Sequence, residues 1–171
     1  RAFSSYNSET KEIYINKNKT YFGNDILFVN NNFSSLKIAY IVGEDVTSID
    51  SLFNQFIKSD ATLIINPCAS KQINETIVSR RQLIKSMSLL GKCAYVSLSG
   101  GKGESTVDYV LSGDNLIYED GQTINESNIF EYKDLVITDI DINHLVSKKE
   151  KSNYIPSKIN QIGFSLKTNV D

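Results

Sequence analysis

The chain has 171 residues, of which 40% are hydrophobic and 22% are charged, close to the proportions of an ordinary globular domain. A net charge of −2 provides no basic footprint for nucleic acid or an anionic membrane, and no apolar run approaches the ~20 residues that span a bilayer. Two cysteines and one histidine exclude a zinc finger and argue against a disulfide scaffold, so we expect a reduced, cytoplasmic protein. The chain opens at Arg1 with neither Met nor a signal sequence, and we expect it to be part of a longer polypeptide.

The first predicted elements are a polar lead-in and two strands. Residues 1–24 show little periodicity and are expected to be loop. Strands are predicted at 26–29 and 36–42, the second being apolar and β-branched like a strand buried on both faces. A helix is predicted from near Ser48, because apolar residues then recur at the spacing of a core-facing stripe. That stripe consists of Ile49, Leu52, Phe53, Phe56 and Ile57.

The middle of the chain continues to alternate strands and helices. A buried strand is predicted at 61–65, ended by Pro67. A longer helix follows at 74–90, with Gly91 at its expected C-cap, and then a strand at 94–98. This βαβαβ pattern predicts parallel strands joined by right-handed crossovers.

The last third of the chain is predicted to be antiparallel. Strands are expected at 107–111, 115–118 and 123–126, the last two joined through the Asp120-Gly121 pair, a strong hairpin signal. A final strand is expected at 135–140. The result is a mixed α/β sheet with helices on one face.

We therefore expect one domain over residues 25–145, preceded by the lead-in 1–24 and followed by a polar tail or linker over 146–171. In such sheets, ligands collect at the carboxyl ends of the parallel strands. Those ends are residues 42–45, 66–70 and 99–101.

Two other features are weak site candidates. The glycine-rich loop 100–105 has the wrong spacing for a P-loop, and a strand is predicted after it where a phosphate loop needs a helix. His144 is expected to be exposed, because no second histidine or cysteine pair could complete a metal site with it.

Either cysteine could be a nucleophile, although small buried thiols usually serve packing. Cys68 is the better candidate than Cys93, because it lies just past a predicted strand end. Its activation would need a neighbouring base.

At these strand ends the sequence resembles the carbon–nitrogen hydrolases, in the variant found in the glutaminase domain of glutamine-dependent NAD synthetases. Val42-Gly43-Glu44-Asp45 is similar to the family's ICED element, and Ile65-Asn66-Pro67-Cys68-Ala69-Ser70 is similar to its NLSAS element. Ser79-Arg80-Arg81 resembles its RR helix. The most specific stretch resembles YVYASAGFGESTTDLVFSG and consists of residues 94–97, 103–108 and 112–113. The collinear match covers roughly residues 20–145.

The resemblance implies a nitrilase-like αββα sandwich, of which this chain forms the C-terminal portion. It also implies cysteine-based hydrolysis of the glutamine side-chain amide, with a Glu as base and a Lys stabilising the oxyanion. The released ammonia passes to a separate domain that uses ATP to amidate nicotinic acid adenine dinucleotide. Homo-oligomers are expected by the same resemblance.

The chain departs from the family pattern at its most important position. Gly43 stands where the nucleophilic Cys belongs, and the sequence leaves open whether this glycine is natural or engineered. Thr76 stands where an Arg would bind the substrate carboxylate, while Ser70 and Glu44 remain as candidate substrate contacts. The catalytic Glu and Lys are expected outside this chain. Cys68 is the one thiol that could replace the missing nucleophile.

The sequence therefore predicts an ammonia-supplying glutaminase domain that is inactive as this chain, with no cofactor or metal of its own. Its expected partners are glutamine, the N-terminal half of the same domain and a synthetase domain. Two alternatives stay open. One is a non-catalytic binding or assembly module on the same fold, and the other is an amidase of the superfamily acting on another amide.

Overall fold

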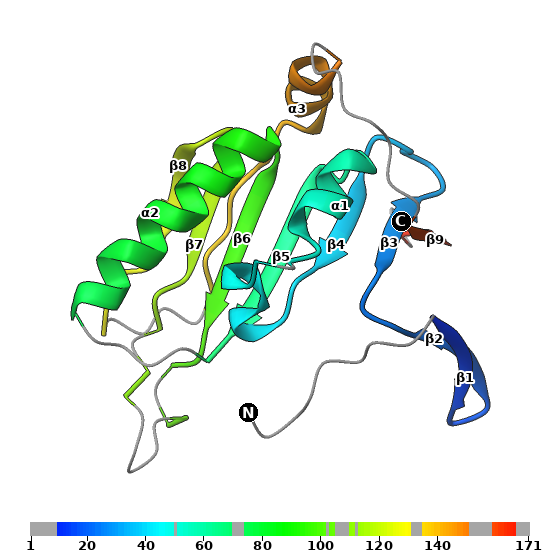
Figure 1. Ribbon diagram of the computed structural model, residues 1–171, viewed down its shortest axis with the longest axis horizontal. Coiled ribbons are helices and arrows are strands. Elements are labelled where there is room, and N and C mark those ends of the chain that lie inside the picture. Colours follow the sequence, from blue (N-terminus) through cyan, green and yellow to red (C-terminus); the bar gives the residue numbers. More distant parts are fainter. Residues whose placement is uncertain are drawn as a thin grey trace, which may run out of the picture.

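The computed structural model describes residues 10–49, 51–69, 74–101, 103–104, 110–111, 113–130, 135–150 and 159–166. Its centre is a seven-stranded mixed sheet in the order β8-β7-β6-β5-β4-β3-β9 (Figure 1). The strands are β3 (Ile26–Asn30), β4 (Lys37–Tyr40), β5 (Leu63–Cys68), β6 (Ala94–Ser99), β7 (Leu116–Glu119), β8 (Gln122–Glu126) and β9 (Asn160–Phe164).

The sheet combines parallel and antiparallel pairs as the sequence predicts. β4, β5 and β6 are parallel neighbours, and β7 turns back antiparallel to β6. β7 and β8 form the predicted hairpin, whose turn residues Asp120 and Gly121 have φ of +47° and +76°. On the other side, β3 is antiparallel to β4 and parallel to β9. The mixed α/β fold class is confirmed.

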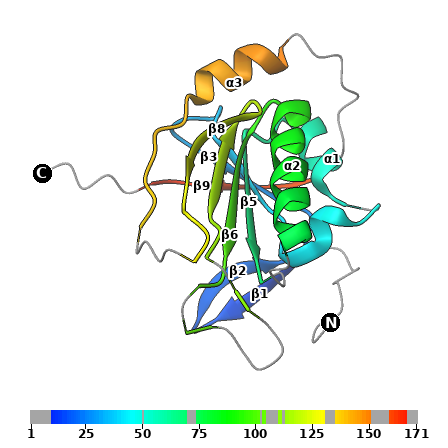
Figure 2. The same ribbon diagram turned by 90° about the vertical axis from the view of Figure 1, so that its left-hand side faces the viewer.

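Two helices cover one face of this sheet (Figure 2). They are α1 (Phe53–Lys58) and α2 (Asn74–Gly91), and a short 3₁₀ helix, η1 (Gly43–Thr47), precedes them. The apolar core lies between these helices and the sheet, with Phe56, Ile64 and Tyr95 completely buried. Among the residues with assigned positions, no helix is long and apolar enough to cross a membrane.

Neither α1 nor α2 packs on the opposite face of the sheet. Phe28 and Tyr40 meet edge to face there, with ring centroids 5.9 Å apart. Tyr40 and Leu98 are 47% and 43% exposed, so this face is both apolar and open to solvent.

The first predicted helix begins later than its periodicity indicates. Ile49 is fully exposed and α1 starts at Phe53, while residues 43–47 form the 3₁₀ turn. The apolar spacing includes Ile49 by coincidence, because Ile49 points into solvent while Leu52 and Phe53 pack against the core.

Pro67 does not end its strand, contrary to the prediction. The carbonyl of Ile65 accepts from the Ile41 amide at 3.0 Å, so alternate residues of β5 direct their polar groups toward β4. Pro67 faces the same way but lies beyond the last β4 pair, Tyr40 with Ile65. Its missing N–H therefore leaves no hydrogen bond unmade, and β5 continues to Cys68.

Gly91 is the last residue of α2 rather than the left-handed residue after it. The left-handed conformation belongs to Lys92, at φ +45°. A Cβ on Gly91 would lie 2.8 Å from Ile57 and 2.9 Å from Phe53, so this glycine permits close packing of α2 against α1. The expected C-cap role was wrong.

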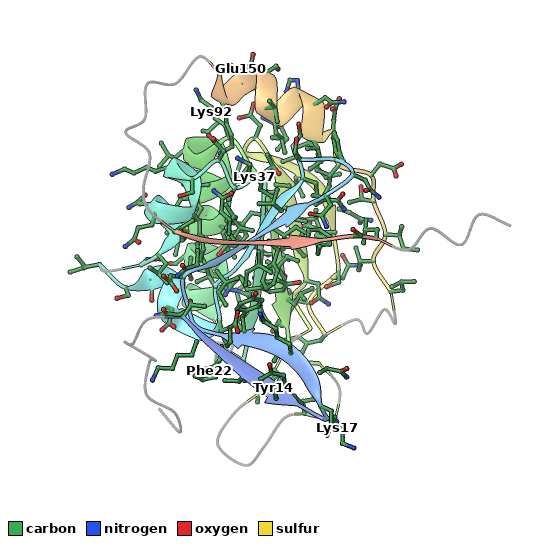
Figure 3. The ribbon with its side chains drawn as sticks, turned by 90° about the vertical axis from the view of Figure 1, so that its right-hand side faces the viewer. Tyr14, Lys17, Phe22, Lys37, Lys92 and Glu150 are labelled. Atoms are coloured by element: carbon green, nitrogen blue, oxygen red, sulfur yellow. The ribbon has the colours of Figure 1, made fainter. Side chains whose placement is uncertain are left out.

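The lead-in is not loop throughout. β1 (Lys11–Ile15) and β2 (Asn18–Phe22) form an antiparallel hairpin that extends from the main sheet (Figure 3). Asn16 and Lys17 make its two-residue turn with φ of +49° and +66°, the mirror-image turn that suits the twist of paired strands. The polar composition of the two strands concealed them from pattern analysis.

The C-terminal part also differs from its prediction. Residues 135–140 pair in no strand, and residues 107–109 of another predicted strand lie outside the described part, whereas Val110 and Leu111 are not in a strand. Helix α3 (Ile142–Lys149) crosses the expected domain end at residue 145, and strand β9 lies within the expected tail.

Candidate functional site

The predicted site lies where β4, β5 and β6 end side by side. Gly43 follows β4 at φ +65°, a left-handed conformation that L side chains rarely adopt. A Cβ at this position would meet no described atom within 4 Å, so a side chain there would project into open space. The turn thus has room for a side chain, but glycine places no reactive group in it.

Asn66 holds this turn in place from the neighbouring strand. Its side-chain amide donates to the carbonyl of Ile41 at 2.6 Å and to that of Gly43 at 3.1 Å. Asn66 is only 2% exposed, so both contacts are made away from bulk water. The sequence included Asn66 in a motif without assigning it a role, and the structure shows that it positions the Gly43 turn.

Cys68 ends β5 beside a positive charge. Nη2 of Arg80 lies 3.0 Å from the Cys68 sulfur and 2.5 Å from Oγ of Ser97, and the thiol contacts the carbonyl of Leu98 at 3.1 Å. Reactive cysteines are found beside positive charges of this kind. Within the described residues, however, no carboxylate or imidazole hydrogen-bonds this thiol, so the base that its activation would need is missing.

A buried ion-pair cluster fixes α2 against the end of the sheet. Asp114 has a fully buried carboxylate that lies 2.5 Å from Arg81 and 3.8 Å from Arg80, and Arg81 also pairs with Glu126 at 3.0 Å. Burial opposes the charge on Arg81, yet these two carboxylates outweigh it and raise the Arg81 pKa. No sequence pattern pointed to Asp114, because Arg80 and Arg81 are more than thirty positions away in the chain.

The glycine-rich loop contains a hydrogen bond between one of its backbone amides and the side chain of Glu104. The carboxylate of Glu104 accepts from the Gly101 amide at 2.7 Å. A bound phosphate would need such amides free, so this contact supports the prediction that the loop is not a phosphate cradle.

Neither His144 nor Cys93 is placed for catalysis in the structure. His144 is exposed on α3, and its backbone N–H donates to the Asp141 carboxylate at 2.9 Å. Cys93 is completely buried, and burial raises its pKa to about 12, so it has no nucleophilic character at neutral pH. Over the described part of the chain, no three His, Cys, Asp or Glu side chains converge as metal ligands.

The remaining predicted contacts are only partly placed. Glu44 lies in η1 and Thr76 in the first turn of α2, at the expected ends of β4 and β5. The side chains of both residues, and all of Ser70, lie outside the described part.

Sequence comparison connects the chain with one group of enzymes. It is 31% identical over 109 residues to a glutamine-dependent NAD(+) synthetase of Mycobacterium leprae, and 29% identical to that of Mycobacterium tuberculosis. The match covers 64% of this chain but spans only 16% of the length of those relatives. No model of a known protein family matches the chain.

Solved structures show the same fold. A glutamine-dependent NAD(+) synthetase from Cytophaga hutchinsonii superposes with a TM-score of 0.60 at 23% identity, over 77% of this chain and 20% of the other. A carbon–nitrogen hydrolase from Helicobacter pylori superposes with a TM-score of 0.59 at 11% identity, over 69% and 44% of the two chains.

Proposed function

We propose that the chain, which is similar in sequence to glutamine-dependent NAD(+) synthetases and shares its fold with carbon–nitrogen hydrolases, forms part of the glutamine-hydrolysing, ammonia-supplying domain of such a synthetase. The sequence likeness to the mycobacterial synthetases supports this choice over the other amidases that share the fold.

The proposed reaction has two covalent steps. A cysteine thiolate attacks the glutamine carboxamide and releases ammonia, a Glu transferring the proton, and water then cleaves the resulting thioester. Ammonia would pass to a synthetase domain that uses ATP and nicotinic acid adenine dinucleotide. The first step needs a sulfur at the turn after β4.

The Gly43 turn is the observation that carries the proposal. It lies at the carboxyl end of β4, is held by Asn66 and has open space where a side chain would project. These features support the proposal that this turn would present a nucleophile if it carried a thiol. We therefore propose that the domain does not hydrolyse glutamine with glycine at this position.

Ammonia release from glutamine by the complete protein tests this proposal. The parent should release none above background, and Gly43→Cys should gain activity, because the thiol would project into the open space. Gly43→Ala is the matched control, since it adds a Cβ with the same backbone strain but no thiol.

The Cys68→Ser variant tests whether Cys68 acts as the nucleophile in place of the missing thiol at position 43. Glutamine hydrolysis by the Gly43 parent would contradict the proposed inactivity, and its loss in Cys68→Ser would identify Cys68 as the nucleophile. Activity in Gly43→Cys should survive the Cys68→Ser change.

A non-catalytic binding or assembly module is the second candidate, favoured by the absence of a side chain at Gly43. Calorimetry with glutamine distinguishes the two, using the parent protein. Saturable glutamine binding supports a domain derived from a glutaminase, whereas no binding supports the assembly module. Binding of a different amide in place of glutamine would indicate the amidase alternative.

A further inference from the structure

Residues 135–140 have the pattern of a β-strand but pair with no other strand. Their sequence, Leu-Val-Ile-Thr-Asp-Ile, is rich in the β-branched residues that favour strands. In the structure these residues alternate between exposed and half-buried, as successive side chains of a strand do. Within the described part of the chain, the segment therefore lacks only a partner strand.

The segment is fixed beside the β7–β8 hairpin. It runs on the side of the sheet away from α2 and leads into α3 (Figure 2). The side-chain amide of Asn125 in β8 donates to the carbonyl of Ile137 at 2.8 Å, and the carboxylate of Glu119 in β7 accepts from the Asp141 amide at 3.1 Å. These contacts hold the segment in place without a backbone ladder.

One edge of the segment carries unused backbone groups. In an extended chain, the N–H and C=O of one residue point to one side, and those of the next residue point to the other. Since the Ile137 carbonyl points toward Asn125, the backbone groups of Val136 and Thr138 point away from it. Among the described residues, no N–H group of residues 135–140 donates a hydrogen bond. Such an edge is a template for another strand.

The outward face of the segment defines what could pair there. Leu135 and Ile137 are 71% and 73% exposed and lie in one row, because they are two positions apart. Asp139 continues this row with an exposed carboxylate. Residues directly opposite each other in paired strands lie on the same face, so a matching strand has apolar side chains opposite the first two and a cation opposite Asp139.

We propose that residues 135–140 receive an extended segment of another polypeptide, one that carries a lysine or arginine followed by apolar side chains at alternate positions. The backbone hydrogen bonds of the new strand provide affinity, and the row of Leu135, Ile137 and Asp139 provides specificity. The basic residue comes first because the two strands run antiparallel. This docking strand does not depend on the reaction that the domain performs.

Hydrogen exchange followed by NMR tests the proposal on the 171-residue chain. The probe is an acetylated peptide of sequence Thr-Lys-Thr-Val-Thr-Val, whose lysine lies opposite Asp139 in an antiparallel pair. At about ten times its Kd, the peptide should slow exchange of the Val136 and Thr138 amides by roughly tenfold. The amides of Leu135 and Ile137 should keep their rates, because they point to the other side.

Two variants separate backbone pairing from side-chain contact. Thr138→Pro removes an N–H from the free edge and should abolish the slowing at Val136, whereas Thr138→Val keeps that N–H and is the matched control. Asp139→Lys should weaken binding of the lysine peptide by roughly fivefold, and a peptide with glutamate in place of lysine should recover it. Thermal unfolding checks that each variant keeps the fold.

Three results would overturn the proposal. The first is no slowing at Val136 and Thr138 with the peptide, and the second is equal slowing in the Thr138→Pro variant. The third is slow exchange without peptide that increases with protein concentration, because the edge would then pair with a second copy of the chain. Equal affinity of the two peptides for the Asp139→Lys variant would overturn the assigned charge preference.

Discussion

At the residue scale, two buried polar side chains illustrate opposite outcomes of burial. Asn66 uses its amide to hold the Gly43 turn through two hydrogen bonds. Lys149 is only 7% exposed, yet its ammonium has no hydrogen-bond partner among the described residues. Burial is the main cause that lowers the pKa of Lys149. The first side chain specifies a site, whereas the second destabilises the fold.

Lys149→Met should therefore stabilise the chain by about 1 kcal/mol, because it keeps the buried stem and removes the unpaired amine. Urea unfolding at neutral pH measures the gain. Lys58→Met, on the exposed side of α1, is the control and should change stability little. Equal stability of Lys149→Met and the parent would show that the amine is solvated in solution.

The pH dependence of this gain has a defined sign. A folded-state pKa below the ordinary value of 10.5 means that folding disfavours the protonated amine. The penalty is complete below the lowered pKa and disappears as the pH rises to 10.5. The difference in unfolding free energy between Lys149→Met and the parent should shrink over that range, and a constant difference would contradict the assignment.

At the scale of elements, the end of α2 separates two roles that glycine can play. Lys92 holds the left-handed conformation, while Gly91 provides the space into which Phe53 and Ile57 pack. A glycine at position 92 would relieve strain, whereas a side chain at position 91 would create it.

Lys92→Gly should thus stabilise the chain by roughly 0.5 kcal/mol, because relief of the left-handed strain outweighs the loss of the exposed hydrogen bond from Lys92 to the Lys148 carbonyl. Gly91→Ala should destabilise the chain by about 1–3 kcal/mol, because the added methyl group overpacks the contact between α1 and α2. Chemical denaturation of both variants measures the pair. Stabilisation by Gly91→Ala would show that the α1–α2 contact is looser than the structure indicates.

At the scale of the whole molecule, the sheet is covered on one face and open on the other. α1 and α2 bury the core side, whereas Tyr40 and Leu98 remain about half exposed on the opposite side (Figure 2). In the proposed sandwich, a second sheet from the N-terminal half of the domain would cover this open face.

When no second sheet covers it, the open face of the 171-residue chain should bind an apolar dye. Replacing Tyr40 and Leu98 together with serine should roughly halve the dye fluorescence of the 171-residue chain, and circular dichroism checks that the variant is still folded at the temperature of the measurement. Val78→Ser removes a similarly exposed apolar group from α2 and is the control. Unchanged fluorescence in the double variant would place the exposed apolar surface elsewhere.

Much of the fold could be predicted from local pattern. The strands 26–29 and 94–98, the helix 74–90 and the Asp120-Gly121 hairpin all follow from short-range periodicity and turn chemistry, and each is present. The strand ends that form the candidate site follow from this alternation of elements. The hairpin at residues 11–22 was missed, because its strands bury little and carry no apolar alternation.

By itself, the sequence determined the mixed α/β class, the position of the Gly43 turn and the absence of a thiol there. Each of these features is set by residues that are close together in the chain, so a local pattern reveals it. Only the tertiary structure decided that Arg80 meets Cys68, that Arg81 meets Asp114 and that β9 joins β3. The β3–β9 junction includes a hydrogen bond between residues 134 positions apart. Such contacts depend on how the whole chain packs, which no local pattern records.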